Sequence, residues 1–234
     1  MKYAFVDYRI SDEELISLEK LEISPIIVPK CCDVYDAING HPDIQLNILD
    51  SKQIIVHKNI SPKIIDKLKN LNIKIIYSEN ILTSKYPWDI MLNAVNLDNL
   101  FLHNLKYTDK NLLKLVNHKT LINTKQGYTK CSTAIVSNNA LITSDKSIVN
   151  SLKNYSMDLL YVPYGDIVLP GLDHGFIGGC CGLVSPNKMA FFGDLNCYTQ
   201  GTKVVKFLEK HNVEPVYLRK GKLIDRGSLM CIDI

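Results

Sequence analysis

The sequence lacks the long features that mark membrane proteins, secreted proteins and nucleic-acid-binding proteins. No segment approaches the roughly 20 consecutive apolar residues that a membrane-spanning helix needs. The first residues meet acidic side chains almost at once, without the apolar run and cleavage site of a signal peptide. Lysine and arginine are scattered, and the formal net charge is only +3, so no basic stripe is present. We therefore expect a cytoplasmic protein with no membrane partner and no nucleic-acid partner.

Cysteine is present, but its spacing excludes the commonest structural uses of this residue. The seven cysteines form an odd count, which argues against a disulfide framework. No C-x-x-C pair of the kind found in zinc sites occurs. The adjacent pairs at 31–32 and 180–181 are expected to be buried apolar filler, with thiol sensing as the alternative. The sequence thus predicts no metal site and no cofactor.

A weak internal repeat organises the chain, whose 46 % hydrophobic and 22 % charged residues are typical of a soluble globular protein. Each copy reads as a strand, a tight turn, a second strand, a capped helix and a third strand. The first copy has strands at 44–49, 53–57 and 73–77, and Ser61 and Pro62 begin its helix. Further copies have strands at 90–95, 100–103 and 120–122, at 131–136, 140–143 and 159–162, and at 178–184, 189–192 and 216–218.

The two ends of the chain together supply a fifth copy. Residues 227–234 read as a first strand only, whereas the N-terminal segment supplies strands at 3–7 and 26–28 around a helix capped by Ser11. Sharing a unit between the ends removes an exposed sheet edge. We therefore expect a single domain over residues 1–234, a closed five-bladed α/β propeller of ββαβ units. The alternative, an open α/β sheet, predicts one strand per helix instead of about three.

In such a ring the first strand of each unit runs beside the central axis, so residues at the strand entrances converge. A cysteine, a histidine and several carboxylates in one place form a nucleophile-and-base arrangement. The residues at these entrances are His41, Asp43, Trp88, Asp89, Lys125, Gln126, Asp173, His174, Asp225, Arg226 and Cys231.

The repeat order resembles, over nearly the whole chain, the pentein superfamily of guanidine-modifying enzymes, which includes arginine deiminase, agmatine deiminase, dimethylarginine hydrolase and amidinotransferases. The segment 227–232 (GSLMCI) resembles the one that carries the family's nucleophile, and 173–176 (DHGF) resembles the one that carries its catalytic histidine. Trp88-Asp89 resembles a substrate-binding segment of the agmatine deiminase type. Residues 126–128 (QGY) resemble the Glu-Gly-Gly entrance of the third unit.

This resemblance implies a Cys-dependent hydrolase or transferase that acts on a guanidine- or amidine-like small molecule through a covalent intermediate. Cys231 is the implied nucleophile, and His174 the acid that protonates the leaving amine and then activates water. Asp89 is the implied partner of the planar guanidinium. The other candidate substrate-binding residues, all at or near the strand entrances, are Trp88, Asn93, Gln126, Asp173 and Asp225.

Two departures from the superfamily pattern are the basis of an alternative function, although the enzyme is favoured because Cys231 and His174 both fall at the expected units. Gln126 stands where the superfamily has Glu, and Phe176 stands where it has Asp, so two guanidinium-binding carboxylates are missing. Asp173 or Asp225 could replace them. Because a buried guanidinium without a paired charge costs several kcal/mol, the alternative is a non-catalytic binding protein of the same fold.

Structural roles are the competing explanations for the individual residues. Cys231 could be a buried strand thiol, His174 a turn residue bonded to its neighbour, and Asp89 the cap of a turn. Asn93 corresponds to Asn47 in the repeat, and both could line the channel or hydrogen-bond to neighbouring backbone.

Overall fold

The computed structural model describes residues 1–234 and contains five three-stranded sheets. In each sheet the central strand pairs antiparallel with the first strand and parallel with the third. The four sheets formed by consecutive strands are β3 (Leu46–Asp50), β4 (Gln53–Val56) and β5 (Lys74–Tyr77); β6 (Val95–Asn96), β7 (Leu100–His103) and β8 (Thr120–Asn123); β9 (Thr133–Ser137), β10 (Ala140–Thr143) and β11 (Asp158–Tyr161); and β12 (Cys181–Ser185), β13 (Lys188–Phe191) and β14 (Glu214–Tyr217).

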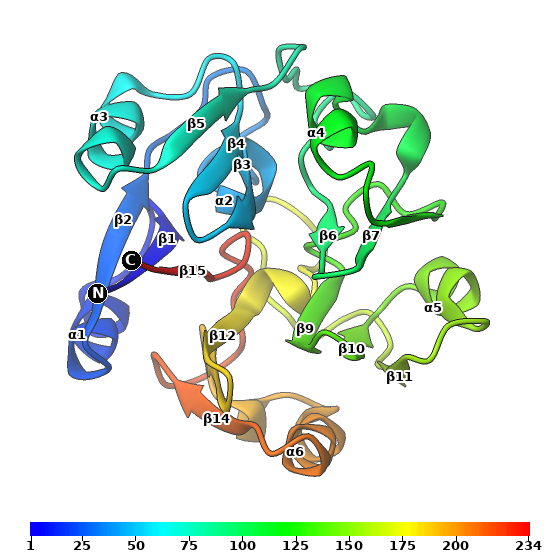
Figure 1. The fold of residues 1–234 in the computed structure, drawn as a ribbon. Helices are drawn as coiled ribbons and strands as arrows, with labels where there is room; N and C mark the ends of the chain where they lie inside the picture. The colour runs from blue at the N-terminus through cyan, green and yellow to red at the C-terminus, as the bar shows by residue number, and fades with distance from the viewer.

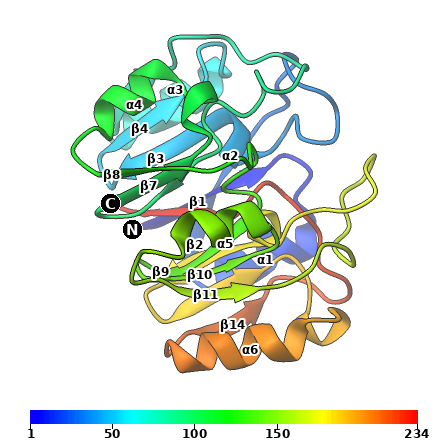
Figure 2. The same ribbon diagram turned by 90° about the vertical axis from the view of Figure 1, so that its right-hand side faces the viewer.

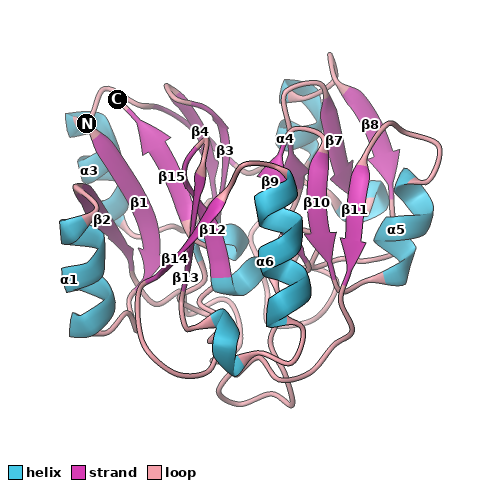
Figure 3. Cartoon of the chain, turned by 90° about the horizontal axis from the view of Figure 1, so that it is seen from below, coloured by secondary structure: helices cyan, strands magenta, loops and turns pink.

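The fifth sheet joins the two ends of the chain, as the sequence predicts. Strand β1 (Lys2–Asp7) lies between β15 (Met230–Asp233) and β2 (Ile23–Val28), with Ala4 opposite Cys231. Figure 1 shows the five sheets around a common centre, and Figure 3 shows both chain ends at the same end of the strands. No hydrogen-bonded strand pair joins one sheet to the next, so neighbouring units are held together by side-chain packing and by single hydrogen bonds, such as that from the Leu229 N–H to the Cys181 carbonyl at 3.1 Å.

A helix connects the second and third strands of every unit and lies on the outer side of its sheet, as α5 and α6 do in Figure 2. Ser11 caps α1 in a capping box with Glu14, and aspartates cap α4 and α5, as expected for orphan N–H groups at helix starts. No helix is both long enough and apolar enough to cross a membrane. The connecting helices are α1 (Asp12–Lys20), α3 (Pro62–Asn70), α4 (Lys110–Leu115), α5 (Lys146–Leu152) and α6 (Gly201–Lys210).

The first strands start later than the apolar pattern predicts. The expected strand at 90–95 is reduced to Val95–Asn96, and short helices α2 (Pro42–Gln45) and η2 (Gly178–Cys180) replace the starts of two others. Further short helical turns are η1 (Leu105–Tyr107) and η3 (Leu195–Cys197). The backbone before these strands is buried, and its polar groups are hydrogen-bonded by side chains instead of by a neighbouring strand. The Asn93 amide, for example, donates to the Asp43 carbonyl and accepts from the Lys130 N–H. Apolarity alone cannot distinguish such buried irregular backbone from a strand.

The core lies between neighbouring units. One cluster of 18 buried residues includes Ile142 of β10 and Phe191 of β13, and another of 13 includes Phe5 of β1 and Ile54 of β4. Each such side chain contributes roughly 1.5–3 kcal/mol by leaving water, so each sheet is stabilised by its neighbours. The rigid frame holds the entrances of the first strands close together.

Candidate functional site

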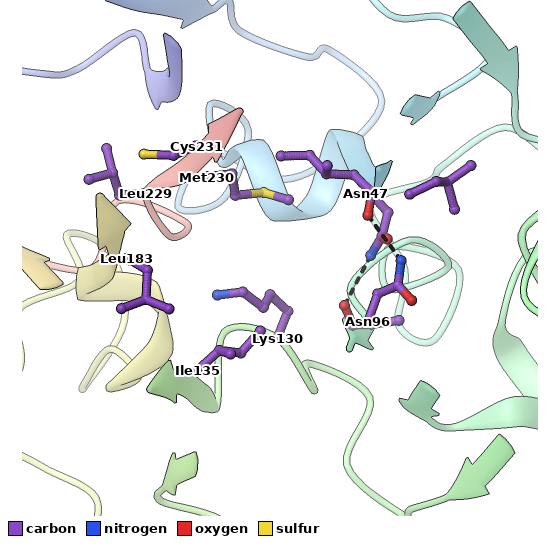
Figure 4. Close-up of a pocket in the computed structure, with 12 residues that line it drawn as sticks. Asn47, Asn96, Lys130, Ile135, Leu183, Leu229, Met230 and Cys231 are labelled. Atoms are coloured by element: carbon purple, nitrogen blue, oxygen red, sulfur yellow. Dashed lines mark hydrogen bonds between the residues drawn. The ribbon is translucent and has the colours of Figure 1, made fainter. Parts of the chain in front are cut away.

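Two cavities lie at successive levels along the first strands of the units. The histidine pocket, of about 220 Å³, is lined mainly by residues that precede these strands, including His41, Cys131, His174 and Asp225. The lysine pocket, of about 270 Å³, is lined by the strands and their immediate surroundings, including Lys130 and Cys231. Figure 4 shows the lysine pocket. The histidine pocket contains the greater concentration of titratable side chains.

The thiol of Cys131 lies between a carboxylate and an amide beneath the histidine pocket. Its Sγ donates to Oδ2 of Asp43 at 3.0 Å and accepts from Nδ2 of Asn93 at 3.2 Å. The Asn93 side-chain oxygen also accepts from the backbone N–H groups of Lys130 and Cys131, at 2.9 and 3.2 Å. Asn93, a predicted substrate-binding residue, therefore holds the thiol in place instead of lining the pocket.

A buried polar chain leads from this carboxylate towards the lysine pocket. Lys130 Nζ donates to the hydroxyl of Ser228 at 2.9 Å, and that hydroxyl lies 2.6 Å from Asp43 Oδ2. Burial raises the pKa of Asp43, and the charge of Lys130 opposes the rise. Burial and then the negative charge of Asp43 raise the pKa of the Cys131 thiol. The resting pair is therefore a thiol that donates to a comparatively basic carboxylate.

His41 is a buried imidazole without a hydrogen-bond partner. Its Nδ1 lies 3.9 Å from Asp225 Oδ1, and its Nε2 lies 3.9 Å from Asp7 Oδ2. Desolvation lowers the pKa of His41, so the ring is neutral and can accept a proton. Gly227, at φ +68°, approaches so closely that a Cβ there would lie 2.2 Å from the His41 Cβ. The position of His41 thus depends on a glycine at 227.

His174 stands in an aromatic wall of the histidine pocket. Its ring stacks on Tyr164 with centroids 5.2 Å apart and meets the edge of Phe176 at 5.8 Å. Phe176 in turn stacks on Tyr128 at 6.2 Å. Phe176 therefore supplies a flat face to this pocket. Planar cations stack favourably on such faces.

Asp225 and Asp173 contribute carboxylates to the histidine pocket. Asp225 is buried, and its two oxygens accept the backbone N–H groups of Gly227 and Phe176, each at 2.9 Å. Burial raises the pKa of Asp225. Asp173 lines the same pocket from an exposed position. The structure thus brings three predicted site residues together here: His174, Asp173 and Asp225.

Three further predicted substrate-binding residues, besides Asn93, do not line this pocket. Asp89 is fully buried behind its wall and accepts a hydrogen bond from the hydroxyl of Tyr128, while burial raises its pKa. Trp88 is 49 % exposed and packs edge-on against Tyr107. The Gln126 amide donates to Asp145 at 2.7 Å and accepts from the Tyr128 N–H at 3.0 Å. These contacts support neighbouring elements without reaching the cavity.

Cys231, the predicted nucleophile, lines the lysine pocket, whereas His174 lines the histidine pocket. The structure therefore does not bring the two residues into one cavity. Strand β15 begins only at Met230, so Gly227 and Ser228 occupy the level of the histidine pocket and Cys231 lies further along. Figure 4 shows the Cys231 sulfur beside Leu229, pointing away from Lys130. Burial raises its pKa to about 12, which leaves the thiol protonated.

Sequence reasoning missed the thiol that does lie in the histidine pocket. Cys131 lies two residues before the first strand of the third unit, the same kind of entrance position that singled out His41 and Asp43. The resemblance to the pentein enzymes led to the prediction of Gln126, five residues earlier, as the site residue of this unit. If the entrance residues had been chosen by their closeness to the first strand, Lys130 and Cys131 would have been predicted.

Two clusters of side chains have the donor atoms for a metal ion. The donor atoms of His41, Asp43 and Cys131 lie within 4.8 Å of one another, and so do those of Cys31, Asp33 and His57. In the second cluster the His57 ring already accepts from the Leu82 N–H at 3.1 Å. In the first cluster, both nitrogens of His41 and one oxygen of Asp43 have no partner. This nitrogen, oxygen and sulfur set matches the ligands that zinc prefers.

One family model matches nearly the whole chain, and solved structures share its fold. The model of a family of unknown function, DUF6873, matches residues 5–230. No curated protein matches the sequence. Solved structures with 7–14 % identity share the fold.

Three solved structures illustrate the shared fold. Dimethylarginine dimethylaminohydrolase from Pseudomonas aeruginosa is 7 % identical, with a TM-score of 0.57 over 92 % of this chain and 91 % of that chain. Agmatine deiminase from C. jejuni is 12 % identical, with a TM-score of 0.55 over 98 % and 92 %. An amidinotransferase of the saxitoxin biosynthetic pathway from Microseira wollei is 8 % identical, with a TM-score of 0.56 over 92 % and 88 %. These similarities support the pentein fold.

Proposed function

The chain belongs to the family of unknown function DUF6873 and has the pentein fold, and we propose that it is an enzyme that acts on a small amidine- or guanidine-like molecule in the histidine pocket. One observation carries the proposal. A thiol, a hydrogen-bonded buried carboxylate and two imidazoles meet at one pocket of about 220 Å³. The proposed frame is a closed five-bladed propeller that forms one domain.

The walls of the pocket suit a planar cation. Asp225 and Asp173 supply negative charge, and Phe176 and Tyr128 supply aromatic faces. A carboxylate and an aromatic face recognise an amidinium together, by hydrogen bonding in its plane and by stacking above it. The proposal therefore assigns binding to Asp225, Asp173 and Phe176.

The proposed nucleophile is Cys131. Its Sγ attacks the amidine carbon while its proton passes to Asp43, 3.0 Å away. The bond from that carbon to the leaving nitrogen then breaks, and the proton held by Asp43 ends on the released amine. A cationic substrate favours the thiolate during this step, because it offsets the negative charge that develops on sulfur.

The imidazoles serve the second step. Neutral His41, or His174 at the rim, accepts a proton from a water molecule that attacks the sulfur-bound carbon. The carbon–sulfur bond breaks, the sulfur regains a proton, and the product leaves as an amide or urea. If an amine replaces water as the attacking group, the same intermediate gives a transferase.

The test is turnover of a panel of small guanidines and amidines, measured as released ammonia or amine, with Cys131→Ser and Cys231→Ser as a matched pair. We expect Cys131→Ser to lower kcat at least 1000-fold and Cys231→Ser to change it less than threefold. Mass spectrometry of the quenched reaction should find the adduct on the peptide that contains Cys131.

The opposite result would restore the assignment made from the sequence. An adduct on Cys231, or full activity of Cys131→Ser, refutes the thiol assignment. Binding of the panel without turnover in the wild-type protein favours the non-catalytic alternative.

A further inference from the structure

The lysine pocket is a second preformed cavity that the proposed reaction does not use. Its volume is about 270 Å³, and its wall includes Ile48, Ile135, Leu183 and Met230, which come from four different units. A pocket of this kind, mostly apolar with a few polar groups, is typical of small-molecule sites. It differs from the histidine pocket in having a cation and no lining carboxylate.

Lys130 supplies the charge of the lysine pocket. The residue is only 9 % exposed, and its ammonium has one protein acceptor, the Ser228 hydroxyl at 2.9 Å. No carboxylate lies within 4.0 Å of it. An ammonium carries three N–H donors, so two remain for a ligand. Figure 4 shows this ammonium extending into the space between Leu183 and Met230.

Asn47 supplies an unpartnered acceptor in the same wall. Its amide nitrogen donates to the carbonyls of Leu92 and Ala94, at 3.1 and 3.0 Å, which fixes the orientation of the amide. Its oxygen is buried and has no hydrogen-bond partner. A buried acceptor without a donor costs about 1–3 kcal/mol. A ligand that carries a hydroxyl or N–H group would recover that cost.

We propose that the lysine pocket binds a small apolar carboxylic acid that also carries a hydroxyl or N–H group, the chemistry of an apolar α-hydroxy acid. The carboxylate accepts from Lys130, the hydroxyl donates to Asn47, and the hydrocarbon lies against Leu183, Ile135 and Met230. This site is independent of the proposed function, because none of its contacts requires the reaction at Cys131.

The probe is 2-hydroxy-4-methylpentanoate, compared by calorimetry with 4-methylpentanoate and 4-methylpentanamide. We expect the hydroxy acid to bind at least tenfold more tightly than the uncharged amide, and also more tightly than the acid without the hydroxyl. Lys130→Met should weaken binding of the hydroxy acid at least tenfold, whereas Lys153→Met, at an exposed lysine, should leave it unchanged.

A second variant keeps the test decisive if Lys130→Met fails to fold. Leu183→Trp fills the cavity without removing the charge and should also abolish binding. Equal binding of the acid and the amide, unchanged binding by Leu183→Trp, or no binding of any acid at 10 mM overturns the proposal. Turnover of amidines by wild-type protein is measured separately, so failure of one proposal does not hide the outcome of the other.

Discussion

The Cys131 sulfur lies 3.0 Å from Oδ2 of Asp43, and both side chains are buried beneath a pocket that also contains His41 and His174. A thiol in contact with a buried carboxylate has an internal acceptor for its proton. In the proposed function, nucleophilic attack begins at this pair.

Replacing Asp43 by Asn tests the proton acceptor directly. Because Asn keeps the shape but cannot take the thiol proton, we expect kcat to fall about 100-fold or more with little change in KM. Steady-state kinetics on the best amidine substrate measure both constants. Asp33→Asn, in the second cysteine–histidine cluster, is the control and should keep wild-type kinetics. Equal kcat in Asp43→Asn and wild type would exclude Asp43 as the proton acceptor.

Buried histidines make the protein less stable in mild acid. Desolvation lowers the pKa of His103 to about 4, so the folded state keeps it neutral where the unfolded chain, with a pKa near 6.5, binds a proton. The unfolded state gains protons as the pH falls below 6.5, and this shifts the equilibrium towards unfolding. For His103 alone, we expect the free energy of unfolding to fall by about 2 kcal/mol between pH 7 and pH 5.

Urea unfolding at pH 7 and pH 5 checks this value by comparing wild type with His103→Gln. Buried carboxylates with raised pKa values, such as Asp225, act in the opposite direction, but they are present in both proteins and cancel. The variant should lose about 2 kcal/mol less than the wild type over this interval. The same pH dependence in both proteins would rule out His103 as the titrating group.

Alanine substitutions at Gly227 and Gly221 distinguish the energetic cost of backbone strain from the cost of displacing His41. Both have positive φ, but a Cβ at 227 meets the His41 side chain at 2.2 Å, whereas nothing lies within 4 Å of one at 221. Gly221→Ala should therefore cost only the left-handed backbone energy, about 1–2 kcal/mol. Gly227→Ala should cost more and also lower activity. Thermal unfolding and amidine turnover of the two variants give the comparison, and equal losses would mean that His41 does not depend on Gly227.

A thiophilic metal ion is expected to inhibit the proposed reaction. Zinc would bind to His41, Asp43 and Cys131, which removes the nucleophile and a candidate base together. Added Zn²⁺ should lower amidine turnover, and excess EDTA should restore it. Cys31→Ser should show the same inhibition as wild type, because the other cluster is not involved. Activation by Zn²⁺ after chelation would instead indicate a metal-dependent reaction.

Local rules of helix and turn formation gave much of the fold correctly. Ser11 caps α1 as its sequence position indicates, whereas Ser61 stands at the start of α3 without a side-chain hydrogen bond. The pairing of β1 with β15 was also predictable, because each chain end alone lacks part of a unit.

The site was less predictable, because it depends on how far each first strand extends. Cys231 was predicted from a segment that resembles the nucleophile segment of the pentein enzymes, yet it lies along β15 beyond Gly227 and Ser228. His174 and Asp225 reach the expected pocket because they lie in loops before their strands. A shift of a few residues at a strand entrance moves a side chain from one cavity to the next, and sequence periodicity does not fix that shift.

The pairing of β1 with β15 has a consequence for protein synthesis. Strand β1 is the central strand of its sheet, but its antiparallel neighbour β15 is translated more than 200 residues later. Until then one edge of β1 has no partner, and such an edge can pair with other nascent chains. The fifth unit can therefore be completed only after β15 has been synthesised, whereas each of the other four sheets can form from a continuous segment of the chain.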